Sequence, residues 1–148
     1  MSELLTFTNR TTMTMNSIRI QETKTSPAVV FDLDNNKFEI TGCSRPEDVV
    51  VFYQPIVDWL CDLKMSINDD LLAKYQNNPI VFKLFLEYFN SSSAKYVLDI
   101  VLLINELFKC GLNVKIEWKY KHNDDDMLET GEEFTDLIKC PISFVEVL

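Results

Sequence analysis

Three consecutive hydroxyl side chains, Ser91, Ser92 and Ser93, follow Asn90 at a point where the hydrophobic pattern of the chain changes. The residues before them predict a strand over 80–88, whereas the apolar residues after them recur at helical spacing. The serines are therefore expected at the start of a helix, where unpaired N–H groups and the positive end of the helix dipole accommodate a phosphate. A phosphoserine would add about −1.5 to −2 charges to this junction between strand and helix, which we call the serine corner (residues 90–93). That charge is enough to change the binding of a partner.

The same serines also have a purely structural interpretation. Serine is among the preferred N-cap residues, so Ser91 or Ser92 would cap the helix by accepting a hydrogen bond from a backbone N–H of its first turn. Local spacing by itself favours the cap over the phosphorylation switch, and both interpretations stay open at this point.

A second candidate for chemistry is a pair of aspartates, Asp32 and Asp34, at the end of the apolar segment 29–33. The pattern resembles the nucleophile segment of haloacid-dehalogenase-type phosphatases, in which two aspartates act as nucleophile and acid beside a magnesium ion. Alternation places both carboxylates on one side of the strand. Against this interpretation, Asn36 stands where Thr or Val is expected, a hairpin turn follows, and the chain is short for such a domain. An aspartate-dependent phosphatase therefore remains an alternative.

A third candidate is the segment 122–126, in which His122 precedes three consecutive aspartates. Neighbouring side chains point apart, which is poor geometry for chelating a metal ion. Aspartates are favoured at the start of a helix by its dipole. The segment thus predicts a helix N-terminus, and the sequence predicts neither a metal site nor a cofactor. The four cysteines form no Cys-x-x-Cys pair, and Cys61 is expected to be a buried apolar side chain.

The remaining pattern predicts an α/β fold in which helices pack on a mixed sheet, in the order β-β-α-β-α-β-α-β. Strands are expected over 28–33, 37–41, 80–88, 114–120 and 142–148, with a loop and a short turn of helix over 66–78. The turn 34–36 joins the first two strands as a hairpin. A capping box of Ser44 and Glu47 is expected to start the first helix. The second helix ends at Gly111, and the third covers 124–137.

The 148 residues are expected to form one domain over 27–148, preceded by a flexible leader over 1–26 that is rich in Thr, Ser and Asn. Met15 is an alternative start of the chain. The net charge of −9 argues against binding to nucleic acids or to anionic membranes, which requires clustered Lys and Arg. The chain has no apolar run near the ~20 residues of a membrane span and no secretion signal, so a cytoplasmic location is expected.

The segment 89–95, Phe-Asn-Ser-Ser-Ser-Ala-Lys, resembles the Leu-Asn-Thr/Ser-Ser-Ser-x-Lys segment of the SiaC family of bacterial regulatory phosphoproteins. Other segments agree with this family in order: 23–29, 38–47, 52–55, 59–60, Gly111 with 114–120, and 126–134. The resemblance covers roughly residues 18–148. It implies a single STAS-like domain, similar to the anti-sigma-factor antagonists, with no catalytic activity of its own.

The resemblance also implies which residues act. In this family the phosphorylated Thr or Ser follows the Asn, which selects Ser91, and the surrounding switch and partner surface comprises Asn90, Ser92, Ser93 and Lys95. The implied partners are a serine/threonine kinase, a metal-dependent protein phosphatase and a diguanylate cyclase that the unphosphorylated form activates in cyclic-di-GMP and biofilm signalling. Three serines replace the Thr-Ser-Ser pattern, so the choice of Ser91 rests on its alignment to Asn90. An anti-sigma-factor antagonist that switches partners at the same corner is the alternative.

Overall fold

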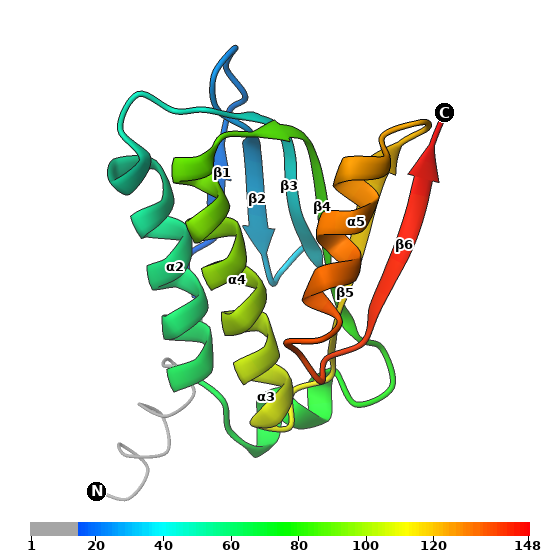
Figure 1. Ribbon diagram of the computed structural model, residues 1–148. Coiled ribbons are helices and arrows are strands. Elements are labelled where there is room, and N and C mark those ends of the chain that lie inside the picture. The colour runs from blue at the N-terminus through cyan, green and yellow to red at the C-terminus, as the bar shows by residue number, and fades with distance from the viewer. Residues whose placement is uncertain (1–14) are drawn as a thin grey trace, which may run out of the picture.

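The computed structural model describes residues 15–148, which fold into one six-stranded sheet and the helices that cover it (Figure 1). The strands are β1 (Ile18–Ile20), β2 (Ala28–Asp32), β3 (Lys37–Ser44), β4 (Ile80–Phe89), β5 (Val114–Lys121) and β6 (Ile142–Val147). The helices are α2 (Val49–Met65), α3 (Asp69–Lys74), α4 (Ser91–Lys109) and α5 (Asp125–Phe134). The strands lie in the sheet in the same order as in the chain.

The sheet is mixed, as the sequence predicts. β1, β2 and β3 pair antiparallel, whereas β3, β4, β5 and β6 pair parallel. Each parallel pair needs a crossover connection, and the helices supply these connections. Figure 1 shows α2, α4 and α5 on the same face of the sheet. The predicted α/β fold is confirmed, and its likeness to STAS domains stays a prediction.

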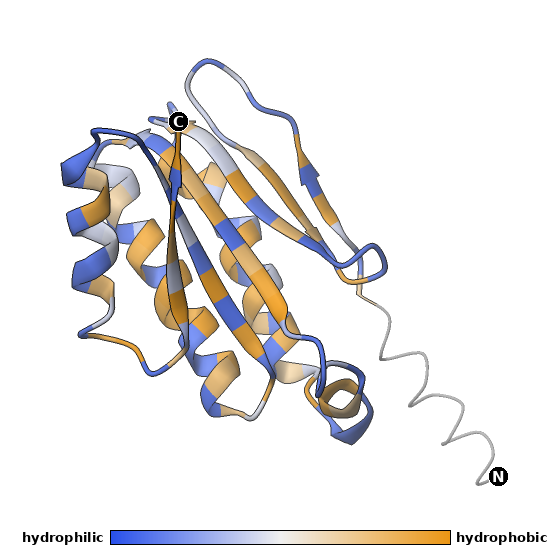
Figure 2. Cartoon of the chain, turned by 90° about the vertical axis from the view of Figure 1, so that its right-hand side faces the viewer, coloured by the Kyte–Doolittle hydropathy of each residue, from blue (hydrophilic) through white to orange (hydrophobic). Residues whose placement is uncertain are grey.

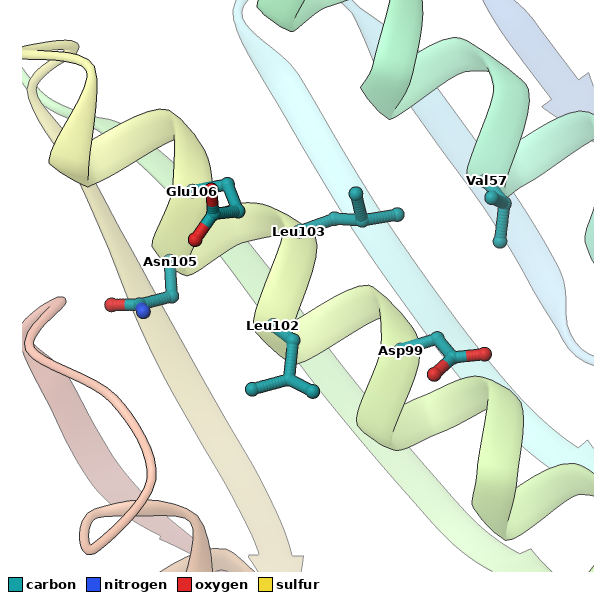
Figure 3. Close-up of a pocket in the computed structure, with 6 residues that line it drawn as sticks. All are labelled: Val57, Asp99, Leu102, Leu103, Asn105 and Glu106. Carbon is teal, nitrogen blue, oxygen red and sulfur yellow. The ribbon is translucent and has the colours of Figure 1, made fainter.

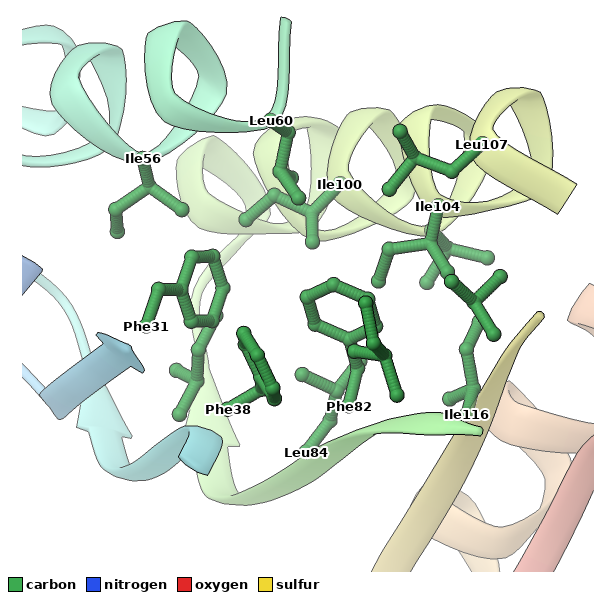
Figure 4. Packing of buried hydrophobic residues seen from close by; sticks show 14 of the residues in the cluster. Phe31, Phe38, Ile56, Leu60, Phe82, Leu84, Ile100, Ile104, Leu107 and Ile116 are labelled. Carbon is green, nitrogen blue, oxygen red and sulfur yellow. The ribbon is translucent and has the colours of Figure 1, made fainter. Parts of the chain in front are cut away.

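The core lies between this face of the sheet and the helices α2 and α4 (Figure 4). Three aromatic rings form its centre: the Phe82 ring lies 5.5 Å from that of Phe31 and 5.3 Å from that of Phe38. Ile56 of α2 and Ile100 of α4 pack onto these rings and are fully buried. Each such side chain contributes about 1.5–3 kcal/mol when buried. This packing fixes where α4 begins relative to the ends of the strands.

The opposite face of the sheet carries no helix in Figure 1 and has a different composition. The strand registers place Glu39 beside Lys83, and Lys83 beside Glu117, in one row across β3, β4 and β5. All three side chains are half-buried, and opposite charges face each other. The resulting alternation of hydrophilic and hydrophobic residues along the strands is visible in Figure 2. It explains why the longer strands of this sheet were predictable from their period.

Strand β1 corrects the prediction of a flexible leader over 1–26. Residues 18–20 pair with residues 29–31 of β2. A strand of three residues is too short to show a period, and pairing with β2 is what orders it. The part of the predicted leader before Met15 lies outside the described residues.

The start of the first helix also differs from the prediction, because Ser44 and Glu47 do not form a capping box. Ser44 is the last residue of β3, and α2 begins at Val49. The side chain of Asp48 caps α2 by accepting a hydrogen bond of 3.0 Å from the Val51 N–H. Ser44 lies on the same face of β3 as Phe38, and this face is buried against the helices. The helix predicted over 124–137 is α5, which ends at Phe134, three residues before the predicted end.

Helix α5 depends on close contact at Gly131, which leads to a prediction. A Cβ added there would lie 2.6 Å from Trp118 Nε1 and 2.8 Å from Phe144 Cε1. We therefore expect Gly131→Ala to lower the free energy of unfolding by about 1–3 kcal/mol, despite the better helix propensity of Ala. Urea denaturation measures this change. The control Glu133→Ala, at an exposed position of the same helix, should stay within about 0.5 kcal/mol of the wild type. Equal stability of both variants would contradict the packing described.

Candidate functional site

Asn90 separates the end of β4 from the start of α4 and caps the helix. Its Oδ1 accepts a hydrogen bond of 2.9 Å from the Ser93 N–H, and its backbone is extended. The helix start at the serines is confirmed, but the interpretation of Ser91 or Ser92 as the cap is wrong. An Asn side chain accepts this hydrogen bond as well as a serine does. The hydroxyls of Ser91 and Ser92 are therefore not needed for capping.

The backbone carbonyl of Ser44 holds the first turn of α4 in place. It accepts a hydrogen bond of 3.0 Å from the Asn90 N–H and one of 3.1 Å from the Ser93 hydroxyl. This contact follows from the sheet, because parallel pairing places Ser44 of β3 beside Phe89, the last residue of β4. The two anchored residues, Asn90 and Ser93, enclose Ser91 and Ser92 in the sequence.

A chain of three buried hydroxyls extends this contact to α2. The Ser44 hydroxyl donates to Ser93 Oγ at 2.9 Å, and Tyr53 OH lies 2.5 Å from Ser44 Oγ. Each hydroxyl has one proton, and those of Ser93 and Ser44 are already used, so Tyr53 donates to Ser44. Burial raises the pKa of Tyr53, which keeps its proton in place. Each buried hydroxyl thus has its hydrogen-bond partner.

The three serines of the corner differ in accessibility. Ser91 and Ser92 are exposed, and neither hydroxyl forms a hydrogen bond with another residue of the described part of the chain. The sequence analysis included Ser93 in the partner surface. Ser93 is 0% exposed, so this part of the prediction is wrong. The third position of the helix faces the sheet, where the Ser44 carbonyl binds it. Of the other predicted surface residues, Lys95 is exposed and Asn90 is half-buried.

Apolar side chains are exposed at the same end of the molecule. The first turns of α2 and α4 lie together at one end of the sheet in Figure 1. Val51, in the first turn of α2, is 68% exposed, and Val50 beside it is also exposed. The exposure of these valines was not predicted from the sequence. The sequence does carry a signal for this exposure. Three consecutive valines at the start of a helix cannot all lie on one buried face, so at least one of them is exposed.

A depression of about 300 Å³ lies on the other side of the corner, between the end of β4 and the start of α5. It is lined by Glu87, Tyr88, Phe89, Asp124, Asp126, Met127 and Thr130. The lining is acidic, and Lys121 forms an ion pair with Glu87. A phosphate at the neighbouring serines would therefore add negative charge to a side that is already acidic.

The aspartate pair of the hairpin has a structural role. The Asp32 side chain is 7% exposed and accepts hydrogen bonds of 2.7 Å from Asn35 Nδ2 and from Arg19 of β1. These hydrogen bonds, that of Asn35 first, lower the pKa of Asp32 to about 2. Asp34 is exposed in the turn. Asp32 closes the hairpin and holds β1, so the structure gives the pair a structural role in place of the phosphatase site that the sequence left as an alternative.

The segment 122–126 starts a helix, as predicted. Asp124 caps α5 by accepting a hydrogen bond of 3.1 Å from the Met127 N–H, and His122 pairs with Glu146 of β6. Within residues 15–148, no group of three or more His, Cys, Asp or Glu could hold a metal ion. Cys61 is exposed, so its predicted burial is wrong, because the buried stripe of α2 passes through Leu60 and Leu63 instead. In the described part of the chain, no helix has the length and apolar character needed to cross a membrane.

Comparison with known proteins gives one family and several similar structures. The model of the SiaC family, described as SiaC family regulatory phosphoprotein, matches residues 20–147. An uncharacterized protein of Pseudomonas aeruginosa strain UCBPP-PA14 is 28% identical over 129 residues, which are 87% of this chain and 95% of that protein.

Two solved structures cover almost all of this fold. SiaC of Pseudomonas aeruginosa superposes with a TM-score of 0.75 at 25% identity, over 90% of this chain and 100% of that chain. A crystal structure of the diguanylate cyclase SiaD in complex with its activator SiaC, from the same organism, matches with a TM-score of 0.72 at 27% identity, over 88% of this chain and 99% of that chain.

The chain of buried hydroxyls generates a prediction. Ser44→Ala leaves the buried Tyr53 hydroxyl without its acceptor, so we expect the free energy of unfolding to fall by about 1–3 kcal/mol. Urea denaturation measures this loss, and Ser92→Ala, at an exposed position, is the control with an expected change within about 0.5 kcal/mol. Adding Tyr53→Phe to Ser44→Ala should cost less than the sum of the single changes. Additive losses would mean that the two hydroxyls do not interact.

Asp32 generates a prediction about pH. Its pKa is lowered from 3.8 to about 2 in the folded protein, so the ionised carboxylate stabilises the fold above about pH 4. That contribution is lost as the pH falls from about 4 to about 2. We expect Asp32→Asn to be less stable than the wild type at pH 7, with a difference that shrinks towards pH 3. Urea denaturation across this range tests it. The exposed Asp34→Asn serves as the control, and a difference independent of pH would contradict the ionic role.

Proposed function

The chain belongs to the SiaC family of regulatory phosphoproteins, and on this premise we propose that it is a non-catalytic switch controlled by phosphorylation of Ser91. In its unphosphorylated form it binds and activates a diguanylate cyclase, and phosphorylation ends this interaction. A serine/threonine kinase and a metal-dependent protein phosphatase set the phosphorylation state. The switch acts in the cytoplasm and needs no cofactor of its own.

The observation that carries the proposal is the contrast among the corner residues. The Ser91 hydroxyl is exposed and has no hydrogen-bond partner among the described residues. The residues on both sides of the Ser91–Ser92 pair are fixed by Ser44. A kinase therefore meets an accessible hydroxyl on a rigid turn. The buried Ser93 hydroxyl would have to break its hydrogen bonds to react.

A phosphate at Ser91 would act on the surface rather than on the fold. The unpaired N–H groups and the dipole at the start of α4 accommodate the dianion, so the helix keeps its first turn. A partner docked on this surface would have to desolvate the dianion, which opposes binding. A penalty of even ~2 kcal/mol weakens binding about thirtyfold. Neighbouring exposed valines, Val50 and Val51, supply apolar contact area for the partner of the unmodified form.

The choice of a diguanylate cyclase as the effector comes from similarity. The SiaC protein that forms a complex with SiaD in Pseudomonas aeruginosa is 27% identical to this chain and shares its fold. An equivalent cyclase is therefore the effector that we propose for this chain. The hairpin aspartates, which suggested an enzyme, are accounted for by the ion pair of Asp32 with Arg19.

Phosphosite mapping tests the proposal. We expect mass spectrometry of the protein purified from its native host to find phosphate on Ser91. The phosphopeptide should be lost in Ser91→Ala and kept in the matched control Ser92→Ala. Pull-down with the unmodified protein should recover a diguanylate cyclase, and Ser91→Asp should recover several-fold less than Ser91→Ala. Phosphate on Ser92 would move the switch by one residue, whereas an unmodified corner under several growth conditions, or recovery of an anti-sigma factor, would overturn the proposal.

A further inference from the structure

Strand β6 forms a free edge of the sheet. In the described part of the chain it pairs with β5 alone, and Figure 1 shows it at the rim of the sheet. Alternate residues of a strand turn their backbone N–H and C=O groups to opposite sides. The carbonyls of Pro141 and Val147 accept hydrogen bonds from the side of β5. The backbone groups that point away from the sheet are therefore those of the alternate residues Ile142, Phe144 and Glu146.

This edge lacks the features that usually protect an edge strand from pairing. Proteins blunt such strands by shortness, by Lys or Pro, or by a bulge. β6 has six residues with a single charge at Glu146, and its register with β5 is continuous. The opposite edge, β1, has only three residues and carries Arg19. The edge of β6 is thus open to a further strand.

The two faces of the sheet differ beside this edge. Phe144 lies under α5, because its ring approaches Gly131, and Ile142 and Glu146 share that face. Residues 145 and 147, both valines, are half-buried on the face that carries no helix. A strand added to β6 would place alternate side chains beside α5 and beside these valines.

The side of α5 that is turned towards the edge is acidic. Asp126 and Thr130 line the depression next to β4, so the opposite side of the helix is turned towards β6. At helical spacing that side carries Asp125, Leu128 and Glu132, and both acids are exposed. The segment 122–138 contains no Lys or Arg. An added strand would therefore meet negative charge on its helix side.

We propose that the free edge of β6 binds an extended basic segment of a partner protein, which joins the sheet as a further strand. Main-chain hydrogen bonds to the three outward-pointing residues of β6 supply affinity. Lys or Arg at every second position lays its apolar stem on Phe144 and its charge beside Asp125 and Glu132. Apolar residues between them contact Val145 and Val147. The ligand is thus a segment in which basic and apolar residues alternate.

A second copy of this chain is a poorer occupant of the edge. Two copies related by a two-fold axis would pair their β6 strands antiparallel, with both α5 helices on the same face of the joined sheet. The acidic sides of the two helices would then be turned towards each other, in chains that each carry a net charge of −9. Like charges repel, so the same edge favours a basic partner.

The depression of about 410 Å³ beside α4, by contrast, does not specify a ligand (Figure 3). Leu102 points away from Leu103 and Val57 in this view, so the lining forms no continuous apolar floor. Glu106 already forms ion pairs of 3.5 Å and 3.2 Å with two lysines. The edge of β6 differs because its backbone groups and its charge select the same kind of ligand.

A short peptide tests the edge in the full-length protein. The probe has about eight residues in which Lys alternates with Val and Thr, with both ends blocked, and the matched control has Glu in place of Lys. We expect the basic peptide to protect the N–H groups of Phe144 and Glu146 from hydrogen exchange in NMR. The acidic peptide should protect neither. The Val145 N–H faces β5 and should exchange at the same rate with either peptide.

Methylation of the peptide backbone separates strand pairing from attraction between charges. Only alternate N–H groups of an added strand face β6. One peptide is methylated at the N–H groups of its Lys residues, and the other at those of its Val and Thr residues. We expect one of them to bind like the parent peptide and the other to bind at least roughly tenfold more weakly. Equal affinities of the two would overturn the proposal.

Variants of the protein test the same contacts from the other side. Glu146→Pro removes an outward N–H that β5 does not use, which an edge strand tolerates. It should bind the basic peptide at least roughly tenfold more weakly than Glu146→Thr, which loses the same carboxylate but keeps the N–H. Urea denaturation checks that both variants fold. If Glu146→Pro does not fold, the methylated peptides decide the question.

A matched pair of charge changes on α5 tests the acidic side. Glu132→Lys, on the side turned towards the edge, should weaken binding of the basic peptide several-fold. Glu133→Lys makes the same change at the next exposed residue, which points to another side of the helix, and should change the affinity by less than about twofold at physiological salt. Equal effects of the two changes would contradict the assigned role of α5.

Four further outcomes overturn the proposal: no binding of the basic peptide, equal binding of the acidic one, protection outside β6, or a dimer in sedimentation that Glu146→Pro dissociates. The last would make a second copy the occupant. None of these results involves Ser91. A phosphate at the serine corner without binding at the edge leaves the proposed switch standing, and binding at the edge without a phosphate leaves this inference standing.

Discussion

The backbone carbonyl of Ser44 is the point on which the geometry of the serine corner depends. It binds the Asn90 N–H and the Ser93 hydroxyl, and its own side chain continues the contact to Tyr53 of α2. These hydrogen bonds exist only because β3 and β4 run parallel and end together. A shift of one strand by one residue would turn Ser44 to the other face of the sheet. The parallel register therefore sets the position of the serines before any partner is present.

Burial of three hydroxyls beside an apolar core has a consequence for the regulation that we propose. Polar groups in such surroundings are stable only when every donor and acceptor is matched, which favours a single arrangement of the corner. Ser93 is fixed inside this arrangement, whereas Ser91 and Ser92 project from it into solvent. The corner thus combines a fixed turn with two exposed hydroxyls. A modification of the exterior can change binding while the buried hydrogen bonds remain intact.

Helix α4 carries the exposed serines on its first turn, and its buried side packs on the sheet and on α2. The serines are therefore attached to one of the long helices that form the core. A phosphate at the corner would have to be desolvated by a partner that docks there, which opposes binding.

The sequence by itself determined the hairpin, the longer strands, the three long helices and the start of α4 at the serines, because these features follow from local period and turn chemistry. It also indicated the family of the chain through several segments that agree with the family in order over roughly residues 18–148. Only the tertiary structure decided that β1 is ordered, that Ser44 ends a strand instead of capping a helix, and that Ser93 is inaccessible. The reason is physical: the chemistry of a serine is the same at every position, and its exposure depends on neighbours that are distant in the chain.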